Sequence, residues 1–62
     1  MKKETKYVVR DYTMEQAGFG GTYTSDYLDT YEDALKEIEQ REYADRVLGI
    51  SDEYYIEKVE VE

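Results

Sequence analysis

Carboxylates and tyrosines crowd the end of the sequence, and their chemistry points most directly to a function. Residues 49–62 contain five acidic side chains and a single base, Lys58. The candidate binding residues of this stretch are Asp52, Glu53, Tyr54, Tyr55, Glu57 and Glu60. Negative charges interleaved with aromatic rings imitate the phosphates and bases of a nucleic acid, and a basic protein surface attracts them. The pattern predicts binding to another protein with a basic surface; the alternative is a solvated face that confers solubility.

The chain as a whole is also acidic. Its 62 residues have a formal net charge of −8, which repels nucleic acid and anionic membrane surfaces. We therefore expect no direct contact with nucleic acid and no membrane association. The first residues, MKKETK, are polar and no long apolar run follows them, so the sequence predicts a cytoplasmic protein.

The composition offers few groups for catalysis or metal binding. There is no cysteine and no histidine, which removes thiol, imidazole and zinc chemistry. Ser25 and Ser51 consequently lack a histidine that could activate them. Asp29, Glu32 and Asp33 lack the ordered ligand loop of a calcium site and fit the start of a helix, where negative charge is favourable. We predict no enzymatic activity, no metal and no cofactor.

A glycine-rich loop surrounds Phe19, with Gly18 before it and Gly20 and Gly21 after it. Loops of this kind bind phosphate when a lysine and a helix follow, whereas here a strand pattern follows. The loop is therefore predicted to connect two strands of a hairpin. Phe19 either folds back onto the core or is exposed as a contact for a partner.

The pattern of residues 31–48 predicts an amphipathic helix. Thr30 can cap its start and Gly49 can end it in the left-handed conformation. Three acid–base pairs at i,i+4 favour the helix, namely Glu32–Lys36, Glu37–Arg41 and Glu42–Arg46. The face expected to cover the sheet consists of Tyr31, Ala34, Leu35 and Ile38.

A second apolar stripe lies farther along the same helix. Tyr43, Ala44, Val47 and Leu48 point roughly opposite to the first face when residues advance by about 100° each. Either the helix kinks near Gln40 to Glu42 and turns these residues inward, or it stays straight and presents Tyr43, Val47 and Leu48 to a partner. The kink is favoured because a small domain needs its apolar residues in the core. A homodimer interface is the alternative.

Period-two patterns predict strands at about residues 6–13, 22–28 and 54–61. Combined with the helix, they predict a single domain over residues 1–62. Its fold class is α+β, a small ββαβ domain in which one helix packs on one face of a three-stranded antiparallel sheet of order 2-1-3.

In size, acidity, tyrosine content and element order, the chain resembles the small proteins of bacteriophages and mobile elements that inhibit host defences, including anti-CRISPR and anti-restriction inhibitors. This resemblance covers the whole chain and involves no specific motif, so no functional residue is transferred. It implies a viral inhibitor that acts in the host cytoplasm and blocks the nucleic-acid or partner site of a nuclease; the acidic residues and tyrosines described above favour the DNA-mimic mode. The alternative expectation is a homodimerising structural or assembly module without inhibitory activity.

Overall fold

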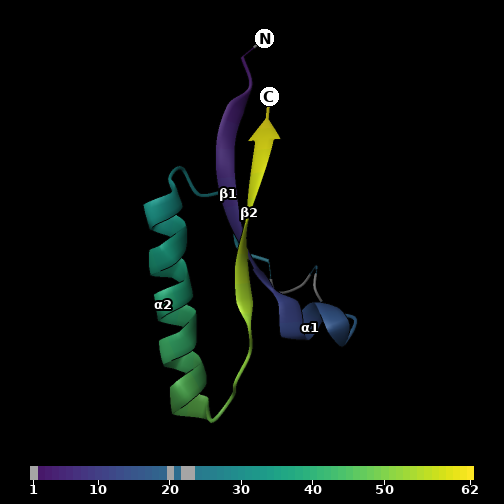
Figure 1. The fold of residues 1–62 in the computed structure, drawn as a ribbon, viewed down its shortest axis with the longest axis vertical. Coiled ribbons are helices and arrows are strands. Elements are labelled where there is room, and N and C mark those ends of the chain that lie inside the picture. The colour runs from purple at the N-terminus through teal and green to yellow at the C-terminus, as the bar shows by residue number, and fades with distance from the viewer. Residues whose placement is uncertain (1, 20, 22–23) are drawn as a thin grey trace.

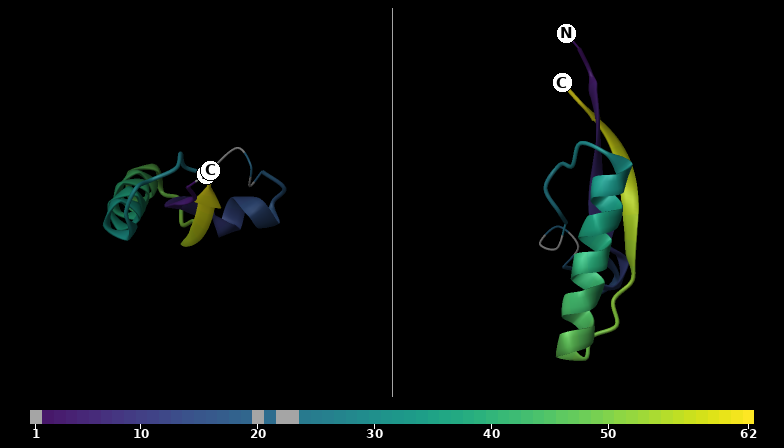
Figure 2. Two further views of the ribbon diagram at one scale, coloured as in Figure 1. Left: turned by 90° about the horizontal axis from the view of Figure 1, so that it is seen from above. Right: turned by 90° about the vertical axis from the view of Figure 1, so that its left-hand side faces the viewer.

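A computed structural model describes residues 2–19, 21 and 24–62 of the chain (Figure 1). Along the described chain, β1 (Glu4–Asp11) is followed by α1 (Tyr12–Gln16), α2 (Tyr31–Leu48) and β2 (Tyr54–Val61). The fold is α+β, with one main helix and an antiparallel sheet of two strands. The molecule is a slab with principal extents of 44 × 24 × 13 Å. The two long strands lie between α2 on one side and α1 on the other (Figures 1 and 2).

The strands β1 and β2 pair over their full length. Eight successive residue pairs run from Glu4 opposite Val61 to Asp11 opposite Tyr54, without a bulge. β2 occupies the residues predicted for the last strand, whereas β1 begins and ends two residues earlier than predicted. It ends early because Asp11 acts as an N-cap: its carboxylate accepts a hydrogen bond from the backbone N–H of Met14 at 3.0 Å, which starts α1.

The predicted strand at 22–28 is not formed by residues 24–28, and residues 22 and 23 lie outside the described chain. This segment follows the free edge of β1 with one isolated bridge, in which Tyr7 and Leu28 exchange two backbone hydrogen bonds of 2.9 and 2.8 Å. Farther along, the Ser25 hydroxyl accepts the N–H of Val9 at 2.8 Å, in place of a backbone carbonyl. A side chain thus interrupts the ladder, and the described residues form neither the three-stranded sheet nor the ββαβ order.

The helix α2 spans the residues predicted from the sequence. The Thr30 hydroxyl accepts the N–H of Asp33 at 3.1 Å, and Gly49 ends the helix with φ of 74°. The helix is continuous through residues 40–42 and runs straight in Figure 1, so the kink favoured from the sequence does not occur. Of the three expected i,i+4 pairs, the structure contains the ion pair between Glu37 and Arg41, at 2.8 Å.

We expect Gly49→Ala to lower the thermal midpoint, because an alanine at positive φ is strained by about 1 kcal/mol. Gly21→Ala is the matched control, since Gly21 has no such φ and its added Cβ would meet nothing within 4 Å. Thermal unfolding followed by circular dichroism at the helix band compares the two variants. An equal loss in both would show that the left-handed helix end is not the cause.

The core is small and lies where α2 crosses β1. Val9 and Ala34 are completely buried, and the ring of Tyr7 meets that of Tyr31 edge-on with centroids 5.9 Å apart. The predicted inner face of α2 is therefore only partly right, because Leu35 is 45% exposed. On the other face of the sheet, Val8 is buried.

The chain has more surface than a closed domain of its size. Its accessible area is 4774 Å², whereas a monomer of 7.4 kDa has about 4,200 Å². Its radius of gyration is 12.5 Å, compared with about 10.6 Å for a compact domain of this length. An open arrangement, in which one long helix lies against a sheet of only two strands, accounts for both values, and it leaves apolar side chains uncovered.

Candidate partner-binding surface

A polar network centred on Arg10 occupies the face of the sheet that points away from α2. The register places Arg10 directly opposite Tyr55, and the guanidinium lies 5.9 Å from the centroid of the tyrosine ring. Arg10 contacts Glu15 through Nε at 2.5 Å and Glu57 through Nη1 at 3.3 Å. The Tyr55 hydroxyl donates a hydrogen bond of 2.7 Å to Glu15, which raises the pKa of the tyrosine. One arginine therefore offsets two carboxylates.

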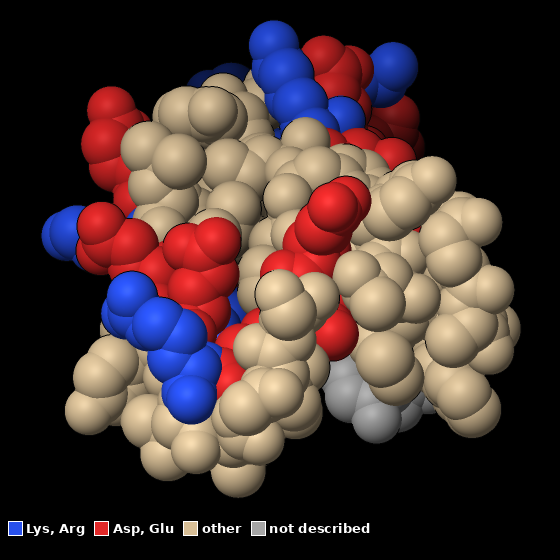
Figure 3. Space-filling model, turned by 60° about the horizontal axis from the view of Figure 1, so that its bottom comes forward, with Lys and Arg blue, Asp and Glu red and all other residues tan. Residues whose placement is uncertain are grey.

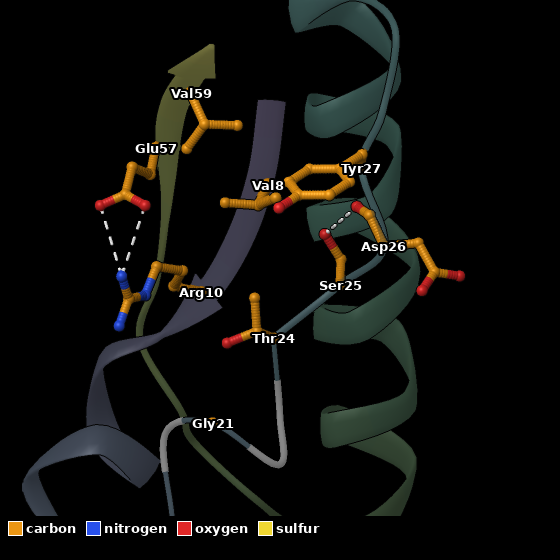
Figure 4. Close-up of a pocket in the computed structure, with 9 residues that line it drawn as sticks. All are labelled: Val8, Arg10, Gly21, Thr24, Ser25, Asp26, Tyr27, Glu57 and Val59. Atoms are coloured by element: carbon orange, nitrogen blue, oxygen red, sulfur yellow. Dashed lines mark hydrogen bonds and ion pairs between the residues drawn. The ribbon is translucent and has the colours of Figure 1, made fainter. Parts of the chain in front are cut away.

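This network changes which of the predicted acids are available to a partner. Glu57 is held by Arg10, as the dashed lines of Figure 4 show, although its side chain remains 44% exposed. Glu53, Glu60 and Glu62 are exposed, and no ion pair involves them in the described part of the chain. The unpaired negative charge of the C-terminal stretch is thus concentrated at the two ends of β2.

Tyr54 has a structural role that the sequence did not reveal. Its side chain points toward α2, where its hydroxyl donates a hydrogen bond to Asp45 and the Arg41 guanidinium lies 5.9 Å from its ring. Burial and then the bond to Asp45 raise the pKa of Tyr54. Because these contacts join the start of β2 to the end of α2, Tyr54 is less accessible to a partner than Tyr55.

Asp52 precedes β2 and lies against a second carboxyl group. Its hydrogen bond to the buried Asp11, followed by burial and by the charges of Asp11 and Asp45, raises its pKa to about 6. Because of this contact with Asp11, Asp52 is partly a member of an internal pair rather than a free surface charge.

Seen from the end where α2 stops and β2 starts, acidic side chains cross the middle of the surface with basic ones beside some of them (Figure 3).

The remaining predicted binding residues lie in two other places. Tyr43, Val47 and Leu48 are exposed near the C-terminal end of α2. Phe19 is exposed and follows α1 in the sequence, and α1 lies on the opposite side of the sheet from α2 (Figure 1). The structure thus distributes the candidate residues over three regions instead of gathering them into one patch.

Two shallow hollows lie on the sheet face that carries the Arg10 network. One has a volume of about 450 Å³, with Val8, Tyr27 and the Arg10–Glu57 pair among its lining residues (Figure 4). The other, of about 490 Å³, is lined by Tyr12, Glu15, Glu53, Tyr54 and Tyr55. Aromatic rings beside carboxylates suit the ammonium or guanidinium group of a partner's lysine or arginine.

Arg10 and Glu15 were missed from the sequence as members of this surface. Their proximity to Tyr55 and Glu57 depends on the register between β1 and β2, which are separated by 42 residues. The acidic pattern of β2 alone does not indicate this proximity. The one usable hint was the period-two placement of Arg10 between Val8 and Tyr12.

Neither helix in the described chain has the length and apolar content needed to cross a membrane. Within residues 2–19, 21 and 24–62, no group of three or more carboxylates is arranged to hold a metal ion. Comparisons with protein-family models, with curated proteins and with solved structures gave no significant match.

Proposed function

We propose that this protein is a non-enzymatic inhibitor that binds the basic nucleic-acid site of another protein, such as a nuclease. The observation that supports it is the exposed negative charge along residues 52–62. Glu53, Glu60 and Glu62 are exposed, and Asp52 and Glu57 are partly exposed. Together with the net charge of −8, these side chains attract a cationic groove and accelerate association with it.

The carboxylates lie on both sides of β2. Glu57 shares the face of Arg10, whereas Glu60 shares the face of Ile56 and Lys58, because successive side chains of a strand alternate. Residues two apart on one face are separated by about 6.7 Å, so Glu60 and Glu62 form a short row of charge. A groove that surrounds the strand contacts both sets of carboxylates, whereas a flat basic surface contacts one.

This function predicts salt-dependent competition with DNA. Against a panel of purified nucleases, including RNA-guided and restriction enzymes, the protein should inhibit at least one, and DNA should displace it. The doubly neutralised variant Glu53→Gln/Glu60→Gln should bind about threefold to tenfold more weakly, as expected for exposed charges. Glu39→Gln, on the exposed part of α2, is the matched control and should bind normally.

Inhibition constants measured at low and high salt test the mimic mechanism. Binding should weaken clearly between about 50 mM and 300 mM salt, because exposed charges are screened. Inhibition that does not depend on salt, or that DNA does not relieve, contradicts the mimic mechanism. The absence of inhibition across the whole panel contradicts the function itself.

A second candidate function is a homodimerising module that uses the exposed end of α2. Tyr43, Ala44, Val47 and Leu48 are neighbours on the helix surface, none is charged, and all are exposed. The excess surface of the chain, about 570 Å² over that of a compact monomer, approaches the roughly 800 Å² that each partner contributes to a stable interface.

This alternative predicts a dimer of twice 7.4 kDa in sedimentation experiments at several concentrations. Val47→Lys should shift the equilibrium to the monomer by more than tenfold, because it places a charge in an apolar contact. Glu39→Gln, outside the apolar group, should sediment like the unaltered chain. A protein that stays monomeric at about 0.5 mM, which is well above the dissociation constant of a specific homodimer, has no such function.

A further inference from the structure

The hydrogen bonds of β1 show which edge of each strand the backbone N–H and C=O groups face. Tyr7 directs its N–H and C=O toward Leu28, and Val9 directs its groups toward Ser25. In an antiparallel pair these directions alternate along each strand, so the residues of β1 that bond to β2 are the even-numbered ones. Their partners in β2 are Tyr55, Glu57, Val59 and Val61.

The other residues of β2 therefore direct their backbone groups away from β1. These are Tyr54, Ile56, Lys58 and Glu60. In the part of the chain that the structure describes, no backbone hydrogen bond reaches this outer side. In the right-hand view of Figure 2, α2 lies in front of β1 and β2 forms the margin of the sheet. The outer edge of β2 is an open row of donors and acceptors about 27 Å long.

We propose that this outer edge binds an extended basic segment of the partner protein, which adds to the sheet as a new strand beside β2. The inference rests on the proposed function for the basic character of the partner, and it adds the mode of binding. Unpaired backbone groups at a strand edge are a template for another strand. The affinity then comes from backbone hydrogen bonds and the selectivity from the charges beside them.

Charge selects a basic occupant over a second copy of the chain. From Glu57 to the C-terminus, β2 and the residue after it contain three glutamates and one lysine. An incoming strand places its side chains about 4.5–5.5 Å from those of β2, close enough for ion pairs on both faces. A lysine or arginine opposite Glu60, which has no ion pair in the described chain, gains such a pair, whereas a second copy brings the same glutamates and its own charge of −8.

Charged side chains on an edge strand commonly prevent aggregation, and that role agrees with the proposal. The charge of β2 is negative overall, because two of its three charged residues, Glu57 and Glu60, are acidic. It therefore opposes pairing with acidic or identical strands and leaves a basic strand free to bind. The edge is also rigid, because eight pairs with β1 and the contacts of Tyr54 with α2 hold β2 in place.

A peptide of eight alternating lysines and threonines, with blocked ends, serves as the probe. Amide signals of the full-length protein are followed by NMR during titration. The outward amides of Ile56, Lys58 and Glu60 should shift, and their hydrogen exchange should slow about tenfold, as expected when each gains a hydrogen bond. The same peptide N-methylated at its two central residues, which lie on opposite edges of a strand, keeps its charge and should lose most of the binding.

Two substitutions of Lys58 separate strand addition from simple charge attraction. Lys58→Pro removes an outward N–H without touching the ladder to β1, as proline is tolerated at such edge positions. Lys58→Pro should weaken peptide binding by about tenfold, because one backbone hydrogen bond is lost and those beside it are weakened. Lys58→Ala removes the same positive charge, keeps the N–H, and should bind as well as or better than the unaltered chain. Circular dichroism is used to check that both variants are folded.

Three outcomes overturn the proposal. In the first, Lys58→Pro binds the peptide like Lys58→Ala, which means that charge alone accounts for docking. In the second, the peptide at millimolar concentration leaves the outward amides unchanged. In the third, the protein self-associates and Lys58→Pro abolishes that association, which assigns the edge to a second copy. Inhibition of a nuclease by the unaltered chain is measured separately and can hold in the first two cases.

Discussion

Replacing Val9 by alanine should unfold a large part of the protein at moderate temperature. Val9 is the one large side chain with no exposed surface in the described chain, and it lies opposite Ile56 on the sheet. Removing two buried methyl groups costs about 2 kcal/mol through lost burial and the remaining cavity. A domain of this length has a stability of roughly 3–9 kcal/mol in total, and the small core here argues for the lower end.

The exposed Val47 offers a matched control for this prediction. The chemical change in Val47→Ala is the same, yet this side chain is 70% exposed and lies in a helix, where alanine is the more favourable residue. The free energy of unfolding of Val47→Ala should therefore differ from that of the unaltered chain by less than about 0.5 kcal/mol. Urea unfolding at 25 °C measures both variants. A comparable loss at the two positions would mean that Val47 is covered in solution, as a dimer requires.

The parts of the fold that were predicted well depend on local patterns. The helix at 31–48 follows from capping by Thr30, the glycine at its end and the absence of proline, and each acts over a few residues. The strand at 54–61 is likewise defined by period two and by the polar turn before it. No tertiary contact is needed to place these boundaries.

The errors arose where a side chain competes with the backbone. Asp11 caps a short helix and ends β1 although Tyr12 and Thr13 continue the strand pattern. Ser25 supplies a hydroxyl where a ladder needs a carbonyl, so residues 24–28 contain one bridge only. The short polar side chains of Asp and Ser form hydrogen bonds with nearby backbone groups and so compete with strand pairing. A period-two pattern of apolar residues contains no information about this competition.

The candidate surface shows the same division between local and distant information. Exposure of Glu60 follows from the alternation of a strand with charged residues, and exposure of Glu53 from its place in the polar turn before β2. The use of Glu57 by Arg10 and of Tyr54 by Asp45 depends on how distant segments pack. The straight helix likewise leaves Val47 outward, because at about 100° per residue its side chain lies on the opposite side of α2 from the buried Ala34.

Acidification from about pH 7.5 to about pH 5 should stabilise the fold, because Asp52, which lies beside Asp11, binds a proton more tightly when folded. The pKa of Asp52 rises from 3.8 to about 6 in the folded chain. The stabilising effect is therefore complete below the unfolded value and is lost as the pH rises through 6. Asp29 has a lowered pKa because of Lys6, and its opposite effect falls below this window. The thermal midpoint should accordingly be higher at pH 5.

Two substitutions of Asp11 distinguish this pair from the general relief of negative charge. Asp11→Asn keeps the acceptor for the Met14 N–H and removes the charge beside Asp52, so the midpoint at pH 7.5 should rise and its pH dependence should shrink. Asp11→Ala also removes the cap of α1 and should lose about 1 kcal/mol of stability. If Asp11→Asn keeps the full pH dependence, the effect comes from the net charge of the chain, and the proton is not held between these two carboxyl groups.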